Sequence, residues 1–351
     1  MSGASERTLN AVKEKRGVAL IICLLIMTIL TVIVLEFNYE VRVDAALKGN
    51  SFLALEAEYA ARSGVTFCKA MLRRDSADDL MLPGNRRTDS LDEDWALATE
   101  PIQVARSIVG TRIIDEDGKL CINRVVSAET YKPDKKAVLQ LQRLLTEYGM
   151  EPEITDTVLD WIDVDSVQRH GGAEGDYYRG LLIPYVCKNG WLRSIDELAL
   201  VKGFTHETVF GYRVPPGNEL FEEEQIEPGL AEYLSVFGGR SGKVNINTAP
   251  ETVLRVMLGE NTGVATEIVA GRIAAPFENM ADLKQRVPAV IGIAEIGKSI
   301  AFKSNCFSIV SEGFIQGMSV RIDAVVERIV PKDTVDVQDI SFRTLAWKVT
   351  R

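Results

Sequence analysis

The sequence is poor in the residues on which metal clusters and thiol chemistry depend. Its 351 residues include five cysteines, which stand apart with no CxxC pair. The spacing typical of zinc ligands is therefore missing. Cys23 lies inside an apolar run, and the sequence leaves open whether any of the other four, Cys68, Cys121, Cys187 and Cys306, form a disulfide.

Signals of catalysis are scarce as well. No GxSxG motif is present, and the two histidines, His170 and His206, lie in polar stretches without a pattern that pairs either of them with a nucleophile. A carboxylate pair for glycoside chemistry could be drawn from the residues between Asp160 and Asp176, but acidic loops are commoner than catalytic pairs. We therefore expect no enzymatic activity, and a membrane-anchored hydrolase is the weaker alternative.

The chain also lacks an excess of positive charge. It has 40 lysines and arginines against 50 aspartates and glutamates, which gives a net charge of −10. Proteins hold phosphate backbones mainly through lysine and arginine, so nucleic acid is a disfavoured partner. With 46% hydrophobic and 26% charged residues, the chain is long enough to bury one large core or two modest ones.

One long apolar run is present near the N-terminus. The eighteen residues from Val18 to Leu35 carry no charge, and this length reaches the lower bound for a helix that crosses a bilayer. Only Thr28 and Thr31 are polar, and their hydroxyls can bond back to the helix backbone. Because a buried core helix would show a polar face, we predict that the segment from Val18 to Leu35 is a membrane anchor.

The charges that flank this run indicate its orientation. Lys13, Lys15 and Arg16 precede the run, whereas the signs are mixed after it. The positive-inside rule then places residues 1–17 in the cytoplasm and the rest of the chain on the other side of the membrane. An ordinary secretory signal is the alternative, but it would have a shorter apolar region followed by a small-residue cleavage site.

The residues directly before the run are more specific. A polar leader that ends in Lys15-Arg16-Gly17 and is followed at once by Val18 resembles the prepilin leaders that are cut after glycine. Most pilins and pseudopilins carry glutamate at the fifth mature position, where this chain has Ile22; in that departure it resembles the K pseudopilins of type II secretion systems. The resemblance implies a prepilin peptidase that cuts between Gly17 and Val18, methylation, and retention of the apolar segment as an assembly helix.

Patterning beyond the run predicts both helix and sheet. Apolar and small residues recur at helical spacing over 18–72, which predicts one long helix with Gly49 and Gly64 as candidate bends. The stretch 73–94 is polar and is expected to be loose. Residues 101–125 are expected to form two strands joined at 115–118, because Asp-Gly is a strong hairpin signal. Alternation over 306–330 predicts a second hairpin, and 340–351 would close the sheet.

An acidic run follows two expected helices within 134–163. Five carboxylates lie within seventeen residues, interleaved with glycines: Asp160, Asp163, Asp165, Glu174 and Asp176. Such oxygens can converge on a hard cation such as calcium, although the spacing is not that of an EF-hand. An acidic loop with solvated charges is the alternative. The run DWIDVDS…GAEGDYY is similar to a K-pseudopilin segment, and this resemblance implies calcium with Asp163, Asp165, Glu174 and Asp176 as ligands.

The segment 243–287 opens with KVNINTAPETVL, in which Thr248 is expected to cap a helix. It resembles the helix-hairpin-helix modules of DNA-uptake proteins. A working hairpin offers glycine amides and nearby basic residues to a phosphate, whereas the turn 258–263 contains no basic residue. We therefore favour a helical domain that contacts protein, and a type IV pilus or DNA-uptake component that binds DNA remains the alternative.

Together these signals predict an α+β fold. A pilin-like long N-terminal helix packs on an antiparallel sheet that is interrupted by a large helical insertion of SAM-like or helix-hairpin-helix-like type. The expected parts are a leader (1–17), a transmembrane and spine helix (18–72), the first part of the sheet domain (73–128), an inserted helical domain (129–300) and the second part of the sheet domain (301–351).

The resemblance also implies a function. It indicates a minor pseudopilin at the tip of the type II secretion pseudopilus, which initiates assembly and takes part in protein export across the outer membrane. A carboxylate in lipid needs a partner charge, usually the amino terminus of the preceding subunit. A tip subunit has no preceding subunit, so the apolar Ile22 at this position suits a place at the tip. The implied partners are the I- and J-type minor pseudopilins, the major pseudopilin, prepilin peptidase and the inner membrane. The domain after the single span would be periplasmic.

Replacement of Gly17 by a bulky residue should leave the precursor uncut, because prepilin peptidase cleaves after glycine. Mass spectrometry of the mature protein should find Val18 as the first residue of the unsubstituted chain. A mature N-terminus beyond residue 35 would contradict the assembly-helix interpretation.

Overall fold

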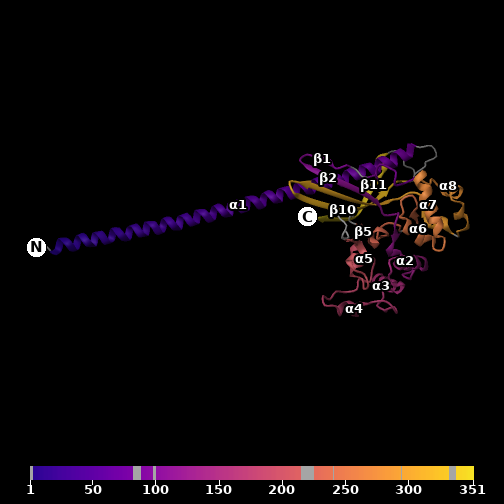
Figure 1. Cartoon of the computed structure of the whole chain (residues 1–351), viewed down its shortest axis with the longest axis horizontal. Helices are drawn as coiled ribbons and strands as arrows, with labels where there is room; N and C mark the ends of the chain where they lie inside the picture. Colours follow the sequence, from indigo (N-terminus) through magenta and orange to yellow (C-terminus); the bar gives the residue numbers. More distant parts are fainter. Residues whose placement is uncertain are drawn as a thin grey trace, which may run out of the picture.

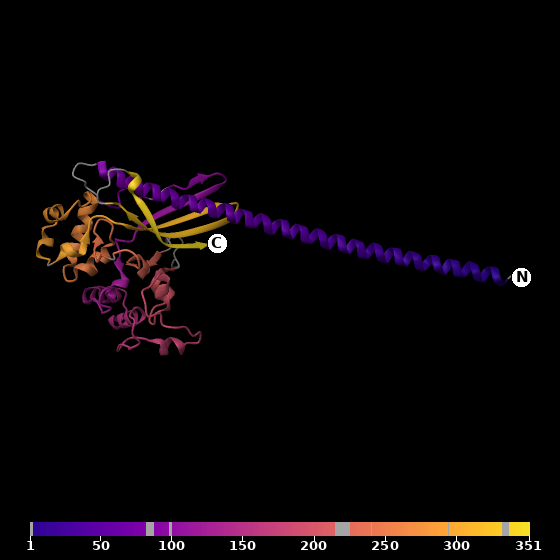
Figure 2. The ribbon, with the colours of Figure 1, turned by 180° about the vertical axis from the view of Figure 1, so that it is seen from behind.

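The structure is a computed structural model that describes residues 3–81, 88–97, 100–214, 225–239, 241–293, 295–331 and 337–351. Helix α1 (Gly3–Met81) extends far out of a body that contains an antiparallel sheet and a helical region (Figure 1). Both views show that only the C-terminal part of α1 lies on the sheet (Figure 2). The predicted α+β class is confirmed.

Helix α1 is longer than predicted at its C-terminal end, because it includes residues 73–81 of the stretch expected to be loose. It passes through Gly49 and Gly64 without a break, so neither glycine ends a segment. Gly64 serves a close approach instead: a Cβ there would lie 2.2 Å from the Ser311 Oγ and 2.7 Å from a Val109 methyl. Ser311 also donates a hydrogen bond to the Ala61 carbonyl, which fixes the helix against the sheet at this point.

The main sheet has five antiparallel strands in the order β1-β2-β9-β10-β11. Its strands are β1 (Ile102–Val104), β2 (Ser107–Asp115), β9 (Cys306–Ile315), β10 (Met318–Ile329) and β11 (Ser341–Thr350). The predicted hairpin of β9 and β10 is confirmed, with Met318 opposite Ile315. The C-terminal strand closes the sheet at one edge, as predicted.

The hairpin predicted at 115–118 is wrong. Strand β2 ends at Asp115 and pairs with β1 and β9, whereas the following short strand β3 (Leu120–Cys121) leaves this sheet and pairs in parallel with β6 (Leu234–Ser235). The local hairpin lies earlier, between β1 and β2, where Ala105 has a φ of 53°. The Asp-Gly pair therefore marks the point at which the chain leaves the sheet.

Between β2 and β9 the chain builds the insertion. Its helices are α2 (Lys135–Glu147), α3 (Thr155–Ile162), α4 (Gly175–Arg179), α5 (His206–Phe210), α6 (Glu251–Leu258), α7 (Thr262–Ala274), α8 (Met280–Arg286) and α9 (Ile296–Ser299). Its 3-10 helices are η1 (Ile122–Val125), η2 (Pro152–Ile154), η3 (Ile195–Leu200), η4 (Leu230–Glu232) and η5 (Pro288–Gly292), and a further one, η6 (Val337–Asp339), precedes β11. Two small sheets pair β4 (Gly211–Val214) with β5 (Gln225–Pro228) and β7 (Val244–Asn245) with β8 (Ile300–Ala301).

The two parts of the body bury separate cores. One core lies between α1 and the sheet: Ala61, Val65, Cys68, Leu72, Trp95, Ile113, Phe307, Ile309, Ile322, Ala324 and Val326. The other fills the insertion, where residues such as Leu144, Val158 and Phe277 are fully buried. No disulfide links the cysteines in the described residues, and burial raises the pKa of the Cys68 and Cys187 thiols to about 11.

A charged network joins these two cores. The side chains of Asp75, Asp89, Glu93, Asp115, Asp117 and Arg328 gather where α1 ends and the insertion meets the sheet, and we call them the junction cluster. Arg328, buried on β10, donates to Asp75 at 3.0 Å, to Asp89 and to the Ser304 carbonyl. A single guanidinium thus ties helix α1, the segment 88–97 and the β8–β9 connection together.

Asp115, the last residue of β2, and Asp117, two residues later, accept hydrogen bonds from the insertion and from the β8–β9 connection. Asp115 accepts hydrogen bonds from the side chains of Asn245, Thr248 and Ser304. Asp117 accepts from three backbone N–H groups, those of Gly239, Asn305 and Cys306. The prediction that Thr248 caps α6 is therefore wrong. The Thr248 hydroxyl donates to Asp115, and α6 has no side-chain cap.

Burial dominates the ionisation of this cluster. It raises the pKa of Asp115 to about 7, and the neighbouring charge of Asp117 acts in the same direction. Burial also raises the pKa of Asp75 to about 6 and that of Glu93 to about 9, where Trp95 donates a 2.5 Å hydrogen bond to Glu93. In the folded chain, burial therefore favours the protonated form of Asp75, Glu93 and Asp115 more than water does in the unfolded chain.

Replacement of Arg328 by methionine should lower the free energy of unfolding by about 3–5 kcal/mol, because it leaves buried carboxylates without a counter-charge. Arg321→Met on the same strand removes only an exposed pair with Asp323 and should cost less than about 1 kcal/mol. Urea unfolding followed by tryptophan fluorescence measures both variants. Equal losses would contradict the role given to Arg328.

The pH dependence of stability tests Asp115 separately. Its pKa rises from 3.8 to about 7 on folding, so the native chain holds a proton in this window that the unfolded chain has lost. Stability should therefore fall as pH rises from about 4 to about 7, by at most about 1.4 kcal/mol per pH unit for one group. Asp115→Asn should make this slope shallower. Identical slopes in the two proteins would contradict the assignment.

Candidate metal centre

The acidic run forms a loop between α3 and α4. Helix α3 ends at Ile162, so Asp163 follows it directly, and Glu174 precedes the first residue of α4. Aromatic packing holds the two ends together, because the rings of Trp161 and Tyr178 meet edge to face with their centroids 5.0 Å apart. Both side chains are buried, so the loop is anchored on the core of the insertion.

Three of the four predicted ligands come together. One carboxylate oxygen from each of Asp163, Asp165 and Glu174 lies within 4.8 Å of the other two. Asp176 is not among them: its side chain is 98% exposed and pairs with Arg179 at 2.6 Å. The spacing in sequence is the reason, because Asp176 lies in the first turn of α4, whereas Glu174 lies before that helix.

Two oxygens in this group lack any partner. Asp163 Oδ1 and Glu174 Oε1 are buried and accept no hydrogen bond. A buried carboxylate oxygen left in this state is costly, since it has lost water and gained nothing in return. Oxygen ligands at this density suit a hard cation, and calcium takes six to eight of them. Backbone carbonyls or water would have to complete its shell.

The sequence missed one residue of this site. Arg169 donates through Nη1 to Asp160 Oδ1 at 2.6 Å and also to Asp163, while its backbone N–H donates to the other oxygen of Asp160. Asp160 is fully buried, so this arginine compensates it and leaves the second oxygen of Asp163 for another partner. The signal that could have identified Arg169 is its position as an arginine within an acidic run.

The ionisation of the ligands points in one direction. Burial raises the pKa of Asp163 and of Glu174, and the negative charges of neighbouring aspartates add to both shifts. For Asp163 the contacts with Arg169 oppose this increase. A cation would bind the deprotonated carboxylates, so its binding should weaken as pH falls.

A second group of carboxylates is already compensated. Oxygens of Asp75, Asp89 and Glu93 also approach one another within 4.8 Å. Arg328, however, donates to Asp75 and Asp89, and Ser90 and Trp95 donate to Glu93. This group belongs to the junction cluster and offers no orphaned oxygen to a metal.

The sequence contains a pattern that is typical of nucleotide-binding loops. The residues GIAEIGKS at 292–299 fit GxxxxGK[ST]. A phosphate-binding loop needs a preceding strand and a long following helix, whereas here η5 precedes and α9 is four residues long. Lys298 pairs with Glu295 at 2.6 Å, and Lys136 donates to Ser299. The pattern therefore lacks the context that its chemistry requires.

The helix-hairpin-helix-like turn is covered from one side. Gly259 ends α6 with a φ of 61°, and a Cβ there would lie 2.6 Å from the Arg143 guanidinium. Arg143 itself donates to the Val256 carbonyl. Arg143, a basic group beside the turn, thus packs α6 against α2.

The predicted anchor lies in the free part of α1. The described residues include one helix, from Val18 to Asp78, that is long and apolar enough to cross a membrane, and its most apolar window is not buried by the rest of the chain. Val18 and Leu35 are both exposed. Gly17 lies in α1, but its side-chain environment is outside the described residues.

Comparisons with known proteins point to one family. Two family models, both described as type II secretion system protein K, match residues 118–213 and 244–300. Among curated relatives, type II secretion system protein K of Aeromonas hydrophila is 25% identical over 203 residues, which cover 54% of this chain and 60% of the relative. The protein of the same name from Klebsiella pneumoniae is 25% identical over 243 residues and 67% of each chain.

A solved structure has the same fold. A chain from the GspK–GspI–GspJ complex of the enterotoxigenic Escherichia coli type 2 secretion system superposes with a TM-score of 0.59 at 15% identity. The superposition covers 88% of this chain and 99% of that one. The sequence matches, in contrast, span only about three-fifths of the Aeromonas relative and of its Pectobacterium counterpart.

We propose that the group of Asp163, Asp165 and Glu174 holds calcium, and thermal unfolding tests it. Chelation should lower the melting temperature, because an ion at one hundred times its Kd stabilises the native state by about 2.7 kcal/mol. Asp163→Ala combined with Asp165→Ala should abolish the response to chelator.

Asp176→Ala is the matched control and should keep the response, since this side chain lies outside the group. A melting temperature that is the same with and without chelator in the unsubstituted chain would favour the alternative of a solvated acidic loop.

Proposed function

Because the chain belongs to the type II secretion system protein K family, we propose that it is a minor pseudopilin at the tip of the pseudopilus, where it initiates assembly and takes part in protein export across the outer membrane. In this proposal its partners are the minor pseudopilins of types I and J, as in the complex named above, and the major pseudopilin. Prepilin peptidase would process its leader.

The free part of α1 supports a single inner-membrane span. Its apolar residues, from Val18 to Leu35, are not buried by the rest of the described chain and would lie in lipid. Lys13, Lys15 and Arg16 before this segment favour a cytoplasmic N-terminus, so the sheet and the insertion would be periplasmic.

The position of the insertion is the observation that carries the proposal. Helices α6, α7 and α8 lie at the end of the body farthest from the N-terminus, beyond the end of α1 (Figure 1). A pilin-like subunit inside a filament needs this end free, because the next subunit stacks there. The insertion covers the end with a domain that has its own core, and such a subunit fits the tip.

Ile22 supports the same position. A glutamate at this place would have to meet a partner charge in the membrane, usually the amino terminus of the subunit ahead. A tip subunit has no subunit ahead, so an apolar side chain costs nothing there. Contacts with neighbours would then run along α1, where Phe52, Leu55 and Tyr59 are exposed.

The DNA-binding alternative has no specific observation in its favour. Arg143 at the helix-hairpin-helix-like turn is bonded to a backbone carbonyl, and the net charge of the chain is −10. Salt-dependent binding of double-stranded DNA would be the result that favours it.

Photo-crosslinkers at Phe52 and Tyr59 of α1 test the tip position in cells. They should capture the other minor pseudopilins, with about one copy of this chain per pseudopilus, and deletion of the protein should impair initiation and secretion. Crosslinks spread along the filament, in amounts that match the major subunit, would contradict the proposal.

Substitution at the fifth mature position tests it further. Ile22→Glu should be tolerated or mildly harmful to secretion, because no subunit lies ahead to require or to exclude a charge. Ile22→Val is the matched control, since it keeps the apolar character. A gain in incorporation along the filament shaft for Ile22→Glu is compatible with this account, whereas a strict requirement for Ile22 is not.

A further inference from the structure

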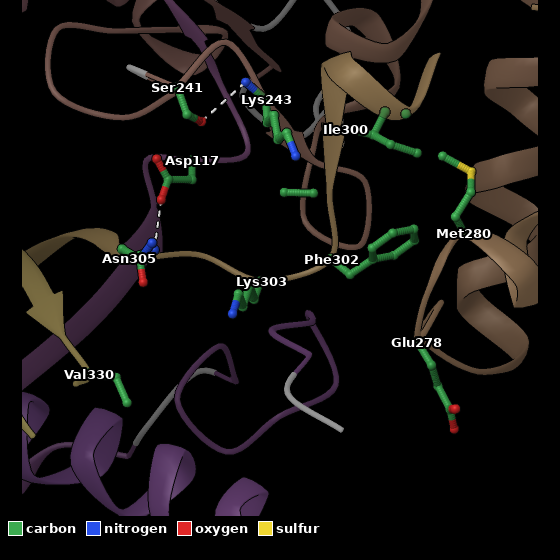
Figure 3. Close-up of a pocket in the computed structure, with 12 residues that line it drawn as sticks. Asp117, Ser241, Lys243, Glu278, Met280, Ile300, Phe302, Lys303, Asn305 and Val330 are labelled. Atoms are coloured by element: carbon green, nitrogen blue, oxygen red, sulfur yellow. Dashed lines mark hydrogen bonds between the residues drawn. The ribbon is translucent and has the colours of Figure 1, made fainter. Parts of the chain in front are cut away.

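A cleft of about 900 Å³ opens where the insertion meets the sheet. It lies apart from the metal centre, and its walls come from the segment before β7, from α8, from β8 and the β8–β9 connection, and from the residue that follows β10 (Figure 3). The volume falls in the range of sites that bind organic ligands rather than single ions. Nothing in the proposed assembly requires a cleft at this place.

One wall of the cleft is apolar. Ile300 of β8, Phe302 after it and Met280 of α8 line this side. Phe302 and Met280 are half-buried and pack on the core of the insertion, so they are held in position while part of each surface faces the opening. The Phe302 carbonyl also accepts from the Asp89 backbone, which fixes this segment to the junction cluster. An apolar side chain could therefore be buried here without a change of fold.

Two ammonium groups border the same opening. Figure 3 shows Lys243 extending toward the middle of the cleft, while Lys303 lies on the opposite side of the opening, between Phe302 and Asn305. Both side chains are exposed, and no carboxylate in the described part of the chain pairs with either. In a protein with a net charge of −10, two lysines beside an apolar wall that pair with no described carboxylate are a local reversal of sign.

The carboxylates of the lining do not neutralise these lysines. Asp117 is occupied by the backbone N–H groups of Gly239, Asn305 and Cys306. The Glu278 carboxylate is directed away from Lys243 at the edge of the cleft (Figure 3). The side-chain amide of Asn305, which lines the cleft beside Asp117 (Figure 3), adds donor and acceptor atoms that suit a peptide backbone.

We propose that this cleft binds an acidic, apolar peptide segment of a partner protein. Carboxylates of the segment meet Lys243 and Lys303, and an apolar side chain between them packs on Phe302, Ile300 and Met280. Ammonium–carboxylate contacts beside a desolvated apolar wall give both orientation and selectivity. Because residues of the insertion and of the sheet side line the cleft together, the segment contacts both parts of the body.

Fluorescence anisotropy with the full-length chain in detergent tests the proposal. The probe is a short labelled peptide of alternating aspartate and leucine, and its counterpart has asparagine in place of aspartate. The aspartate peptide should bind at least about tenfold more tightly than the asparagine peptide, which corresponds to the loss of about 1.4 kcal/mol. Lys243→Gln with Lys303→Gln should weaken the aspartate peptide about tenfold and leave the melting temperature unchanged.

Two controls make the result specific. Lys284→Gln removes an exposed lysine of α8 outside the cleft and should have no effect. Charge reversal, Lys243→Glu with Lys303→Glu, should transfer the preference to a peptide of alternating lysine and leucine. Equal binding of the aspartate and asparagine peptides, unchanged binding by the double glutamine variant, or full displacement of the peptide by inorganic phosphate would each overturn the proposal.

Discussion

The contact of Arg328 with buried carboxylates is the interaction on which the rest of the structure depends. This guanidinium reaches α1 through Asp75, the segment 88–97 through Asp89, and the return to the sheet through the Ser304 carbonyl. Asp115 and Asp117 then bind the opposite side, where the insertion begins and ends. The two strands that flank the insertion, β2 and β9, pair directly with each other, so the sheet itself is continuous and the insertion has to be fixed to it by other contacts. The junction cluster supplies that connection with charged side chains whose burial is compensated by hydrogen bonds.

The junction cluster holds the two hydrophobic cores in a fixed position relative to each other. The core between α1 and the sheet is small and uses the C-terminal part of α1, whereas the insertion packs its own larger core. In the proposed tip position, force on the insertion would reach α1 through the junction cluster, because Arg328 bonds to Asp75 of that helix. The acidic loop lies away from the junction on α3 and α4 (Figure 1), so a bound cation would order the far part of the insertion and leave the junction unaffected.

The sequence predicted those features that local patterns determine. The long helix, the β9–β10 hairpin, the C-terminal edge strand and the helices α2 and α3 follow from periodicity.

Prediction from the sequence failed where a residue has a distant partner. The Asp-Gly pair at 117–118 is a local signal for a hairpin. In the structure the Asp117 carboxylate instead accepts hydrogen bonds from the distant backbone N–H groups of Asn305 and Gly239, and no hairpin forms there. Thr248 has the sequence of a helix cap but bonds to Asp115 instead, and Asp75 lies in a stretch that composition alone marks as loose. At the candidate site, three of the four predicted ligands lie together because they flank one loop, whereas Asp176 lies in the first turn of α4 and pairs with Arg179.

Hydrogen exchange at increasing denaturant, resolved by peptide in the full-length chain, tests the central claim most directly. If the junction cluster joins the two cores, amides of β9 and of the segment β7–α6 should lose protection together, in one cooperative opening. Asp115→Ala should separate them, so that β7–α6 opens at lower denaturant than β9. Independent opening of the two segments in the unsubstituted chain would contradict the account.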